Sequence, residues 1–241
     1  MHARNKNLVG ICSYNEGDKI RRVIERFNNY NLYDVLIIDD ASSDGSIDRL
    51  PLNPYVAVIR NKENKGAGYG TRQIIEYAKN KSYEVIIFAA GNDKDDPQDV
   101  VKLLTAIYEG GNDFVQGSRY LSGGEFGNMP FYRRVATRIM HPRLFSLISG
   151  MKITDSTNGF RATRMNIYSD SRIDLSQEWL DRYELEPYLF YKVIKLGYKV
   201  TEVPVRKIYP PHKEGYTKMR PFIGWWSILR PLVFLALGIK K

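Results

Sequence analysis

Acidic and polar side chains follow one strongly apolar segment of this chain of 241 residues. The segment Val85–Ala90 breaks abruptly into Gly-Asn-Asp-Lys-Asp-Asp-Pro at positions 91–97. An apolar run of this length with β-branched residues is typical of a central strand of a parallel sheet, and α/β sheets bind ligands beyond the carboxyl ends of their strands. We therefore expect these side chains to face a ligand crevice. The alternative is a solvated loop in which Asp95 or Asp96 caps the next helix.

Two earlier apolar segments also end in polar residues. Leu8–Cys12 runs into Ser-Tyr-Asn-Glu at positions 13–16, and Val35–Ile38 runs into Asp-Asp-Ala-Ser-Ser-Asp-Gly at positions 39–45. Carboxylates accept hydrogen bonds from the N–H groups of a base or the hydroxyls of a ribose, and the ring of Tyr14 is suited to stack on a base. Three loops of the same chemical character predict a nucleotide site.

The elements that position these loops alternate between strand and helix. Apolar residues at helical spacing, from Ile20 to Phe27, predict an amphipathic helix after the first strand. A helix at 103–108 and a strand at 114–116 continue the alternation, which is typical of a doubly wound α/β sheet. The length suits one large domain with a substantial core.

Short motifs follow one another along most of the chain in a recognisable order. They are Ser-Tyr-Asn-Glu (13–16), Ile-Asp-Asp-Ala-Ser-Ser-Asp-Gly (38–45), Asn-Lys-Gly-Ala-Gly (64–68), Asp-Pro (96–97), Gly-Ser-Arg-Tyr (117–120), Arg-Arg (133–134), Asp-Ser-Thr-Asn-Gly-Phe-Arg (155–161), Glu-Val-Pro-Val (202–205) and Gly-Tyr-Thr-Lys (215–218). This set resembles the family 2 glycosyltransferases of GT-A fold, and it is most similar to their dolichol- or polyprenyl-phosphate sugar synthase branch.

The resemblance implies a mixed, mainly parallel α/β sheet flanked by helices, with a catalytic domain at 1–220 and a C-terminal tail at 221–241. It implies an inverting enzyme that moves a sugar from a UDP- or GDP-sugar to a polyprenyl or dolichyl phosphate at the cytoplasmic membrane face. Two alternatives remain open. One is transfer to a saccharide or lipid-linked saccharide, and the other is a non-catalytic relative that binds nucleotide sugars.

The resemblance also assigns site residues. Donor-nucleotide contacts are expected from Ser13, Tyr14, Glu16, Asp39, Asp40, Asn64, Gly66 and Gly91. Contacts with the acceptor phosphate are expected from Arg119, Arg133, Arg134, His212 and Lys218. A phosphate oxygen is already ionised near neutral pH, so the enzyme needs cations that hold two anionic reactants together more than it needs a general base.

The chain departs from the family pattern in the loop at 91–97. The related synthases carry an Asp-x-Asp motif that binds Mg2+ or Mn2+, and these two positions here are Ala90 and Asn92. A hard divalent cation prefers several oxygen ligands. A metal would therefore use Asn92 and Asp93, or recruit Asp155; otherwise the enzyme dispenses with it and Lys94 neutralises the departing diphosphate. We expect weak or optional metal dependence.

An acidic pair, Glu184 and Glu186, lies where many inverting relatives carry an acceptor-side acid. If the acceptor is a sugar hydroxyl, Glu186 would have to serve as general base, because a protonated hydroxyl is a poor nucleophile. If the acceptor is a phosphate, no base is required. The alternative for both residues is charge that stabilises a helix N-terminus.

The net charge of +9 predicts an acidic partner. Most of the arginines after position 133 lie near apolar and aromatic residues in the sequence. No nucleic-acid motif is evident, so an anionic membrane surface is the expected partner. The apolar tail at 222–241 is interrupted by Arg230 and Pro231, which favours a pair of interfacial helices over a membrane span. Packing on the domain or on another subunit of a homo-oligomer is the alternative. The polar start of the chain and its one cysteine, Cys12, favour a cytoplasmic, peripheral protein on the inner face of the membrane.

Overall fold

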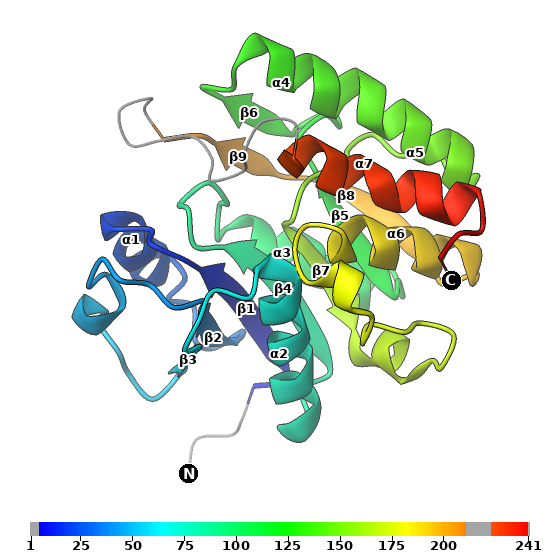
Figure 1. The fold of residues 1–241 in the computed structure, drawn as a ribbon. Coiled ribbons are helices and arrows are strands. Elements are labelled where there is room, and N and C mark those ends of the chain that lie inside the picture. Colours follow the sequence, from blue (N-terminus) through cyan, green and yellow to red (C-terminus); the bar gives the residue numbers. More distant parts are fainter. Residues whose placement is uncertain (1–4, 211–222, 241) are drawn as a thin grey trace.

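One mixed sheet organises the computed structural model, which describes residues 5–210 and 223–240. Its strands are β1 (Asn7–Ser13), β2 (Asp34–Asp39), β3 (Val56–Arg60), β4 (Val85–Ala90), β5 (Phe114–Ser118), β7 (Arg161–Arg164) and β8 (Val200–Pro204). They lie side by side in the order β3-β2-β1-β4-β7-β5-β8 (Figure 1).

Parallel pairing brings the ends of three strands to one edge of the sheet. Strand β1 pairs with β2 and β4, so that Ser13 lies opposite Asp39 and Cys12 lies opposite Ala90. The polar loops that follow these strands therefore meet, as the sequence predicts. Strand β7 runs antiparallel to both β4 and β5. The expectation of a mixed, mainly parallel α/β sheet flanked by helices is confirmed.

Helices cover both faces of the sheet because successive strand residues point in opposite directions. The helices of the first half are α1 (Asp18–Arg26), α2 (Ala67–Asn80) and α3 (Asp99–Tyr108). Val9 and Ile11 pack into one core with α1 and α3, whereas the intervening strand positions, such as Leu8, face α2. The amphipathic helix predicted after the first strand is α1.

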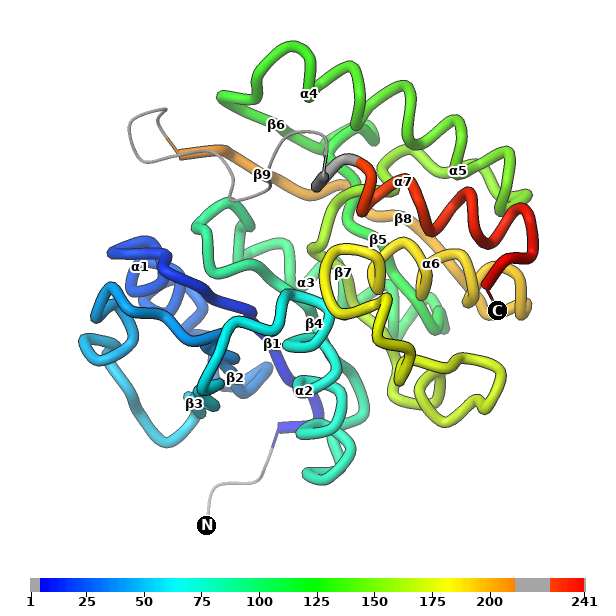
Figure 2. Tube along the Cα trace, in the orientation of Figure 1, coloured from blue at the N-terminus to red at the C-terminus, as the bar shows by residue number. Residues whose placement is uncertain are grey.

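A second helical layer is built from the later part of the chain. Its helices are α4 (Phe131–Val135), a π-helical turn (Ala136–Met140), α5 (His141–Ser149), α6 (Leu185–Lys195) and α7 (Ile223–Ala236), and short 3-10 helices lie at Ile47–Arg49, Met165–Ser169 and Glu178–Leu180. Figure 2 shows α4, the π-helical turn and α5 as one continuous rod. Phe145, Phe190 and Leu232 join α5, α6 and α7 in one apolar core. Helix α6 begins at Leu185, so Glu186 lies in its first turn.

The C-terminal tail differs from the expected pair of interfacial helices. A single helix, α7, continues through Arg230 and Pro231 and packs against α5 and α6 (Figure 1). Its anchor is the buried Glu184, which pairs with the Arg230 guanidinium at 2.5 Å and accepts a hydrogen bond from Ser227. Packing on the domain, the alternative from the sequence, is what the structure contains. Within the described ranges, no helix has the length and apolar character to span a membrane.

A small second sheet reaches over the edge where β4 ends. Strand β6 (Glu125–Gly127) pairs in parallel with β9 (Arg206–Ile208), and Lys207 of β9 forms an isolated bridge with Asp95. This bridge brings Lys207 and Tyr209 beside the acidic loop, although they are more than a hundred residues away in the sequence.

Candidate active site

The donor side of the site is formed by the loops after β1 and β2. Asp39 is buried, and its carboxylate accepts hydrogen bonds from the Ser42 backbone N–H at 3.1 Å and from Arg60 Nε at 3.2 Å. The ring of Tyr14 remains 38% exposed next to this carboxylate-bearing edge. The two loops are tied together, because Asn15 accepts the Ser43 backbone N–H and its own N–H donates to Ser42 Oγ. An acid, a guanidinium and an exposed aromatic ring are thus held on one rigid edge.

Asp40 organises the next loop of the donor side. Its carboxylate accepts hydrogen bonds from the Asn61 side chain and from the backbone N–H groups of Lys65 and Gly66, at 2.8–3.0 Å. Asn64 donates to the Asp40 carbonyl at 3.4 Å. With all these partners inside the protein, Asp40 shapes the pocket by holding the 61–66 loop.

The glycines that open α2 approach protein backbone. A Cβ on Gly66 would lie 2.5 Å from the Asp181 carbonyl oxygen, and a Cβ on Gly68 would lie 1.9 Å from that of Leu180. Gly66 also has a φ of 102°, a conformation that favours glycine. These glycines let α2 dock against the segment before α6.

Most acidic side chains of the loop after β4 pair with cations of the protein or accept hydrogen bonds from backbone N–H groups. Asp93, with a φ of 57°, points to α1 and accepts hydrogen bonds from Arg22 and Arg26, both at 2.7 Å. Asp95 accepts the Ala90 backbone N–H and pairs with Lys207. Asp96 accepts the backbone N–H of Gln98, which is itself the N-cap residue of α3. Helix α3 has no side-chain cap hydrogen bond, so the alternative in which Asp95 or Asp96 caps it is wrong.

Two other residues of this loop face the strand ends. The Gly91 backbone N–H donates to the Cys12 carbonyl, and a Cβ on Gly91 would lie 3.3 Å from that of Ser13. The Asn92 Oδ1 atom and the Ser13 Oγ atom are buried and have no hydrogen-bond partner among the described residues. Buried polar atoms without a partner are uncommon in proteins, and a bound ligand is one explanation for them.

Lys94 is the buried cation of the loop. Only 7% of it is exposed, and its Nζ atom lies 4.4 Å from the centroid of the Tyr209 ring. The Arg133 guanidinium from α4 lies 5.4 Å from the same ring. Burial, with Lys207 and Arg133 nearby, lowers the pKa of Lys94 to about 7, and Glu16 and Asp95 oppose this shift. The cluster has an excess of positive charge at the end of β4.

Arg119 is fixed by a buried network on the acceptor side. Its Nε and Nη2 atoms donate to the Asp155 carboxylate at 2.6 and 2.8 Å, and Nη2 also donates to Thr157 Oγ1 at 2.8 Å. Glu202 holds this loop by accepting the backbone N–H groups of Thr154 and Asp155. Burial raises the pKa of Glu202, and these hydrogen bonds oppose the shift.

The remaining acceptor residues differ in position. Arg134 is exposed, with its guanidinium 5.2 Å from the centroid of the Phe131 ring. His212 and Lys218 lie outside the described residues. Glu186, in the first turn of α6, has a side chain that is 42% exposed and pairs with Arg161 at 3.1 Å. Glu184 anchors α7 and is separate from the site.

The expected metal ligands are dispersed. Asp93 and Asp155 are each paired with different arginines, and Asn92 contributes a single amide oxygen. Across residues 5–210 and 223–240, no group of three or more His, Cys, Asp or Glu side chains is placed to hold a metal ion. The residues that the sequence suggested for Mg2+ or Mn2+ therefore do not form one site.

Sequence reasoning missed several residues that shape this site: Arg60, Lys207, Tyr209 and the Glu202 carboxylate. Glu202 belongs to a recognised motif, but its contact with the 154–155 loop depends on the pairing of β5 and β8. Tyr209 carries no local signal, because only the β9 bridge brings it to Lys94.

Known proteins were compared with this chain. The family model described as Glycosyl transferase family 2 matches residues 8–172. A dolichyl-phosphate hexose transferase of Haloferax volcanii is 30% identical over 80% of this chain and 79% of its own length. A UDP-N-acetylglucosamine–dolichyl-phosphate N-acetylglucosaminyltransferase of Methanococcus voltae is 28% identical over 83% and 84% of the two chains. A polyprenol monophosphomannose synthase of Mycolicibacterium smegmatis is 28% identical over 89% and 81%.

Solved structures share the fold. Glucosyl-3-phosphoglycerate synthase from Mycobacterium tuberculosis, in complex with Mn2+, UDP and glucosyl-3-phosphoglycerate, superposes with a TM-score of 0.66. The alignment covers 98% of this chain and 80% of that one, at 14% sequence identity.

Proposed function

The chain belongs to glycosyl transferase family 2, and from this membership we propose that it transfers a sugar, with inversion, from a nucleoside-diphosphate sugar to a polyprenyl phosphate. One observation carries the choice of acceptor. Relatives that cover about four fifths of this chain or more have dolichyl-phosphate or polyprenol monophosphomannose in their names. The expected acceptor side supports this choice, since it contains the partly buried Arg133 and the buried Arg119, whose guanidinium groups match phosphate oxygens in geometry.

The proposed reaction is a single in-line displacement. A phosphate oxygen of the lipid forms a bond with the anomeric carbon while the bond from that carbon to the diphosphate oxygen breaks, and the electron pair leaves with the nucleoside diphosphate. Because the attacking oxygen carries no proton, positioning and charge stabilisation supply the catalysis. Tyr14 would stack on the base and Asp39 would bind the base or ribose, while Arg119 and Arg133 would hold the acceptor phosphate.

The test incubates the protein with radiolabelled UDP- and GDP-sugars and a short polyprenyl phosphate, and then counts label in the organic phase. We expect lipid-phase label with at least one donor. Label that appears only in a water-soluble saccharide, when oligosaccharides are supplied in parallel, would overturn the acceptor assignment. In that case Glu186, at the rim of α6, would be the candidate base.

A membrane-facing surface is part of the proposal. We assign it to the rod from α4 to α5, whose exposed apolar residues include Phe131, Met140 and Leu147, with exposed fractions of 70%, 66% and 81%. Exposed arginines lie on the same rod: Arg134, Arg138 and Arg143. Apolar side chains beside cations are suited to the headgroup region of an anionic bilayer.

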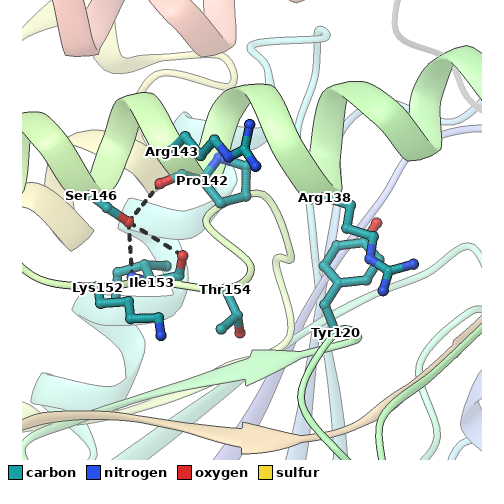
Figure 3. Close-up of a pocket in the computed structure, with 8 residues that line it drawn as sticks. All are labelled: Tyr120, Arg138, Pro142, Arg143, Ser146, Lys152, Ile153 and Thr154. Carbon is teal, nitrogen blue, oxygen red and sulfur yellow. Dashed lines mark hydrogen bonds between the residues drawn. The ribbon is translucent and has the colours of Figure 1, made fainter.

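A cationic cavity under this rod supports the assignment. Arg138 and Arg143 line its helix side, and Lys152 and Thr154 come from the loop below (Figure 3). The cavity has a volume of about 410 Å³, and these three cations form no ion pair with the described acidic residues. An anionic headgroup would supply the missing charge.

Vesicle sedimentation tests this surface. We expect the protein to pellet with phosphatidylglycerol vesicles and to lose binding in the variant Leu144→Ser/Leu147→Ser. The control is Leu52→Ser/Val101→Ser, which removes two exposed apolar residues elsewhere. Equal pelleting of both variants would contradict the assignment. The inner-face location and a homo-oligomeric state stay predictions.

A further inference from the structure

The loop after β4 does not fit a divalent cation, because its oxygen ligands are missing or already used. Ala90 brings no ligand atom, and Asn92 brings one neutral oxygen. The Asp93 carboxylate accepts both Arg22 and Arg26, with each of its oxygens at 2.7 Å from a guanidinium nitrogen. Mg2+ and Mn2+ favour sites with several oxygens, carboxylates among them. A cation here would have to break ion pairs that fix the loop to α1.

The carboxylates of Asp95 and Asp155 also have partners within the protein. Asp95 is bound to Lys207 and to the Ala90 backbone N–H. Asp155 is held in a bidentate pair by Arg119. Lysine and arginine side chains of the protein therefore balance the negative charge of these carboxylates, as a metal ion would otherwise do.

Positive charge of the protein gathers around Lys94, in the loop after β4. Lys94, of which only 7% is exposed, contacts the ring of Tyr209. Arg133 contacts the same ring, so that an ammonium and a guanidinium lie around one buried side chain. Glu16 of the donor loop is close enough to Lys94 to oppose the lowering of its pKa. Lys94 is thus fixed between the donor loop after β1 and the acceptor helix α4.

We infer that Lys94 binds the diphosphate of the donor in place of a divalent cation, so that donor binding requires no metal. This inference rests on the proposed use of a nucleoside-diphosphate sugar. The ammonium donates hydrogen bonds to phosphate oxygens and stabilises the charge that grows on the leaving diphosphate.

The loss of the two Asp-x-Asp carboxylates then has a physical reason. An anionic diphosphate beside two carboxylates needs a metal to screen the repulsion, whereas a diphosphate beside the Lys94 ammonium does not. Asn92 at the second position keeps a neutral acceptor, Oδ1, which is buried and has no partner among the described residues. A hydroxyl of the donor sugar nucleotide would donate a hydrogen bond to this Oδ1 atom.

The first experiment measures UDP and GDP binding by calorimetry without any acceptor, in EDTA and in MnCl2. We expect the same Kd in both solutions for the nucleotide that binds. Binding that disappears in EDTA would overturn the inference and leave the proposed transfer reaction intact. Absence of binding by either nucleotide in both solutions would overturn the donor assignment on which the inference rests.

Variants separate Lys94 from the rest of the loop. Lys94→Gln should weaken nucleotide binding in EDTA by about tenfold or more, as expected for the loss of a charge-assisted hydrogen bond. The control Lys79→Gln removes an exposed lysine of α2 and should leave Kd unchanged. Unfolding temperatures of both variants check that the fold is retained. Equal affinity of Lys94→Gln and wild type would contradict the role of Lys94.

The converse variant restores the family's carboxylates. In Ala90→Asp/Asn92→Asp/Lys94→Gln, nucleotide binding should become dependent on MnCl2, because the acids now need a cation. Binding at wild-type affinity in EDTA by this variant would show that Lys94 does not replace the metal.

Discussion

Arg119 and Asp155 form a buried bidentate ion pair, with Nε–Oδ2 and Nη2–Oδ1 distances of 2.6 and 2.8 Å. The pair links the end of β5 to the loop before β7, and it fixes one face of the Arg119 guanidinium. No described residue accepts a hydrogen bond from the Nη1 group. The pair therefore fixes the position of the guanidinium that we propose for the acceptor phosphate.

Removing Asp155 should destabilise the protein and misplace this cation. Because Asp155→Ala leaves a buried guanidinium unpaired, we expect a loss of about 3–5 kcal/mol in the free energy of unfolding. Urea denaturation measures it. Glu25→Gln, which breaks the exposed Arg21–Glu25 pair of α1, is the control and should cost less than about 0.5 kcal/mol. Similar losses in the two variants would contradict the structural role of the buried pair.

Asp155→Asn separates positioning from folding. The amide retains the shape of the side chain but weakens its hold on Arg119, so the KM for polyprenyl phosphate should rise more than kcat falls. A fall in kcat with an unchanged KM would argue against a role through the acceptor phosphate.

Glu186→Gln distinguishes the two acceptor classes. With a phosphate acceptor, the rate should fall less than about tenfold, since the nucleophile needs no base; with a sugar hydroxyl as acceptor, loss of the base should cost about a hundredfold or more. Initial rates with saturating donor measure the difference. A collapse of lipid-phosphate transfer in this variant would contradict the proposed chemistry.

Glu184 should control the attachment of α7. Glu184→Ala leaves Arg230 without its carboxylate, and we expect a destabilisation of about 3 kcal/mol, together with faster hydrogen exchange of the α7 amides. Glu178→Ala, which removes an exposed acid on the neighbouring 3-10 helix, is the matched control. Unchanged exchange in α7 after Glu184→Ala would show that apolar packing alone holds the helix.

His141 should make the folded state sensitive to acid. Burial lowers the pKa of His141 to about 4, and its ring nitrogens contact Ser156 Oγ and the Ile228 carbonyl of α7. The unfolded chain, with a histidine pKa of about 6.5, takes up the proton first. The stability is therefore complete above pH 6.5 and falls by up to about 3 kcal/mol as the pH drops toward 4.

The variant His141→Gln removes this titration. Denaturation of wild type and variant between pH 4 and 7.5 should give a stability difference that shrinks as the pH falls. A difference independent of pH would mean that the pKa of His141 is the same in the folded and the unfolded states.

Much of the fold was predictable because local patterns determine it. The apolar runs before Ser13, Asp39 and Gly91 are strands, and their parallel pairing brings the polar loops together as expected. The assignment of Arg119 and Arg133 to the acceptor phosphate stays a prediction.

Long-range pairing determined what the sequence could not reveal. Asp93 looked like a metal ligand, but the left-handed turn at its backbone directs it to arginines on α1. Pro231 suggested a broken tail, yet the buried Glu184–Arg230 pair and the core around Leu232 hold a continuous helix. Contacts of this kind depend on elements far apart in the chain, and no periodicity signals them.

The most direct test of the central claim compares two acceptors that differ only in the phosphate. Polyprenyl phosphate and the polyprenol of the same chain length are each incubated with the protein and the radiolabelled nucleotide sugar that it binds, and lipid-phase label is counted over time. We predict label with polyprenyl phosphate and none with polyprenol, because the phosphate supplies both the nucleophile and the charge that Arg119 and Arg133 bind. Equal labelling of the two lipids, or labelling of neither alongside a labelled saccharide, would contradict the account.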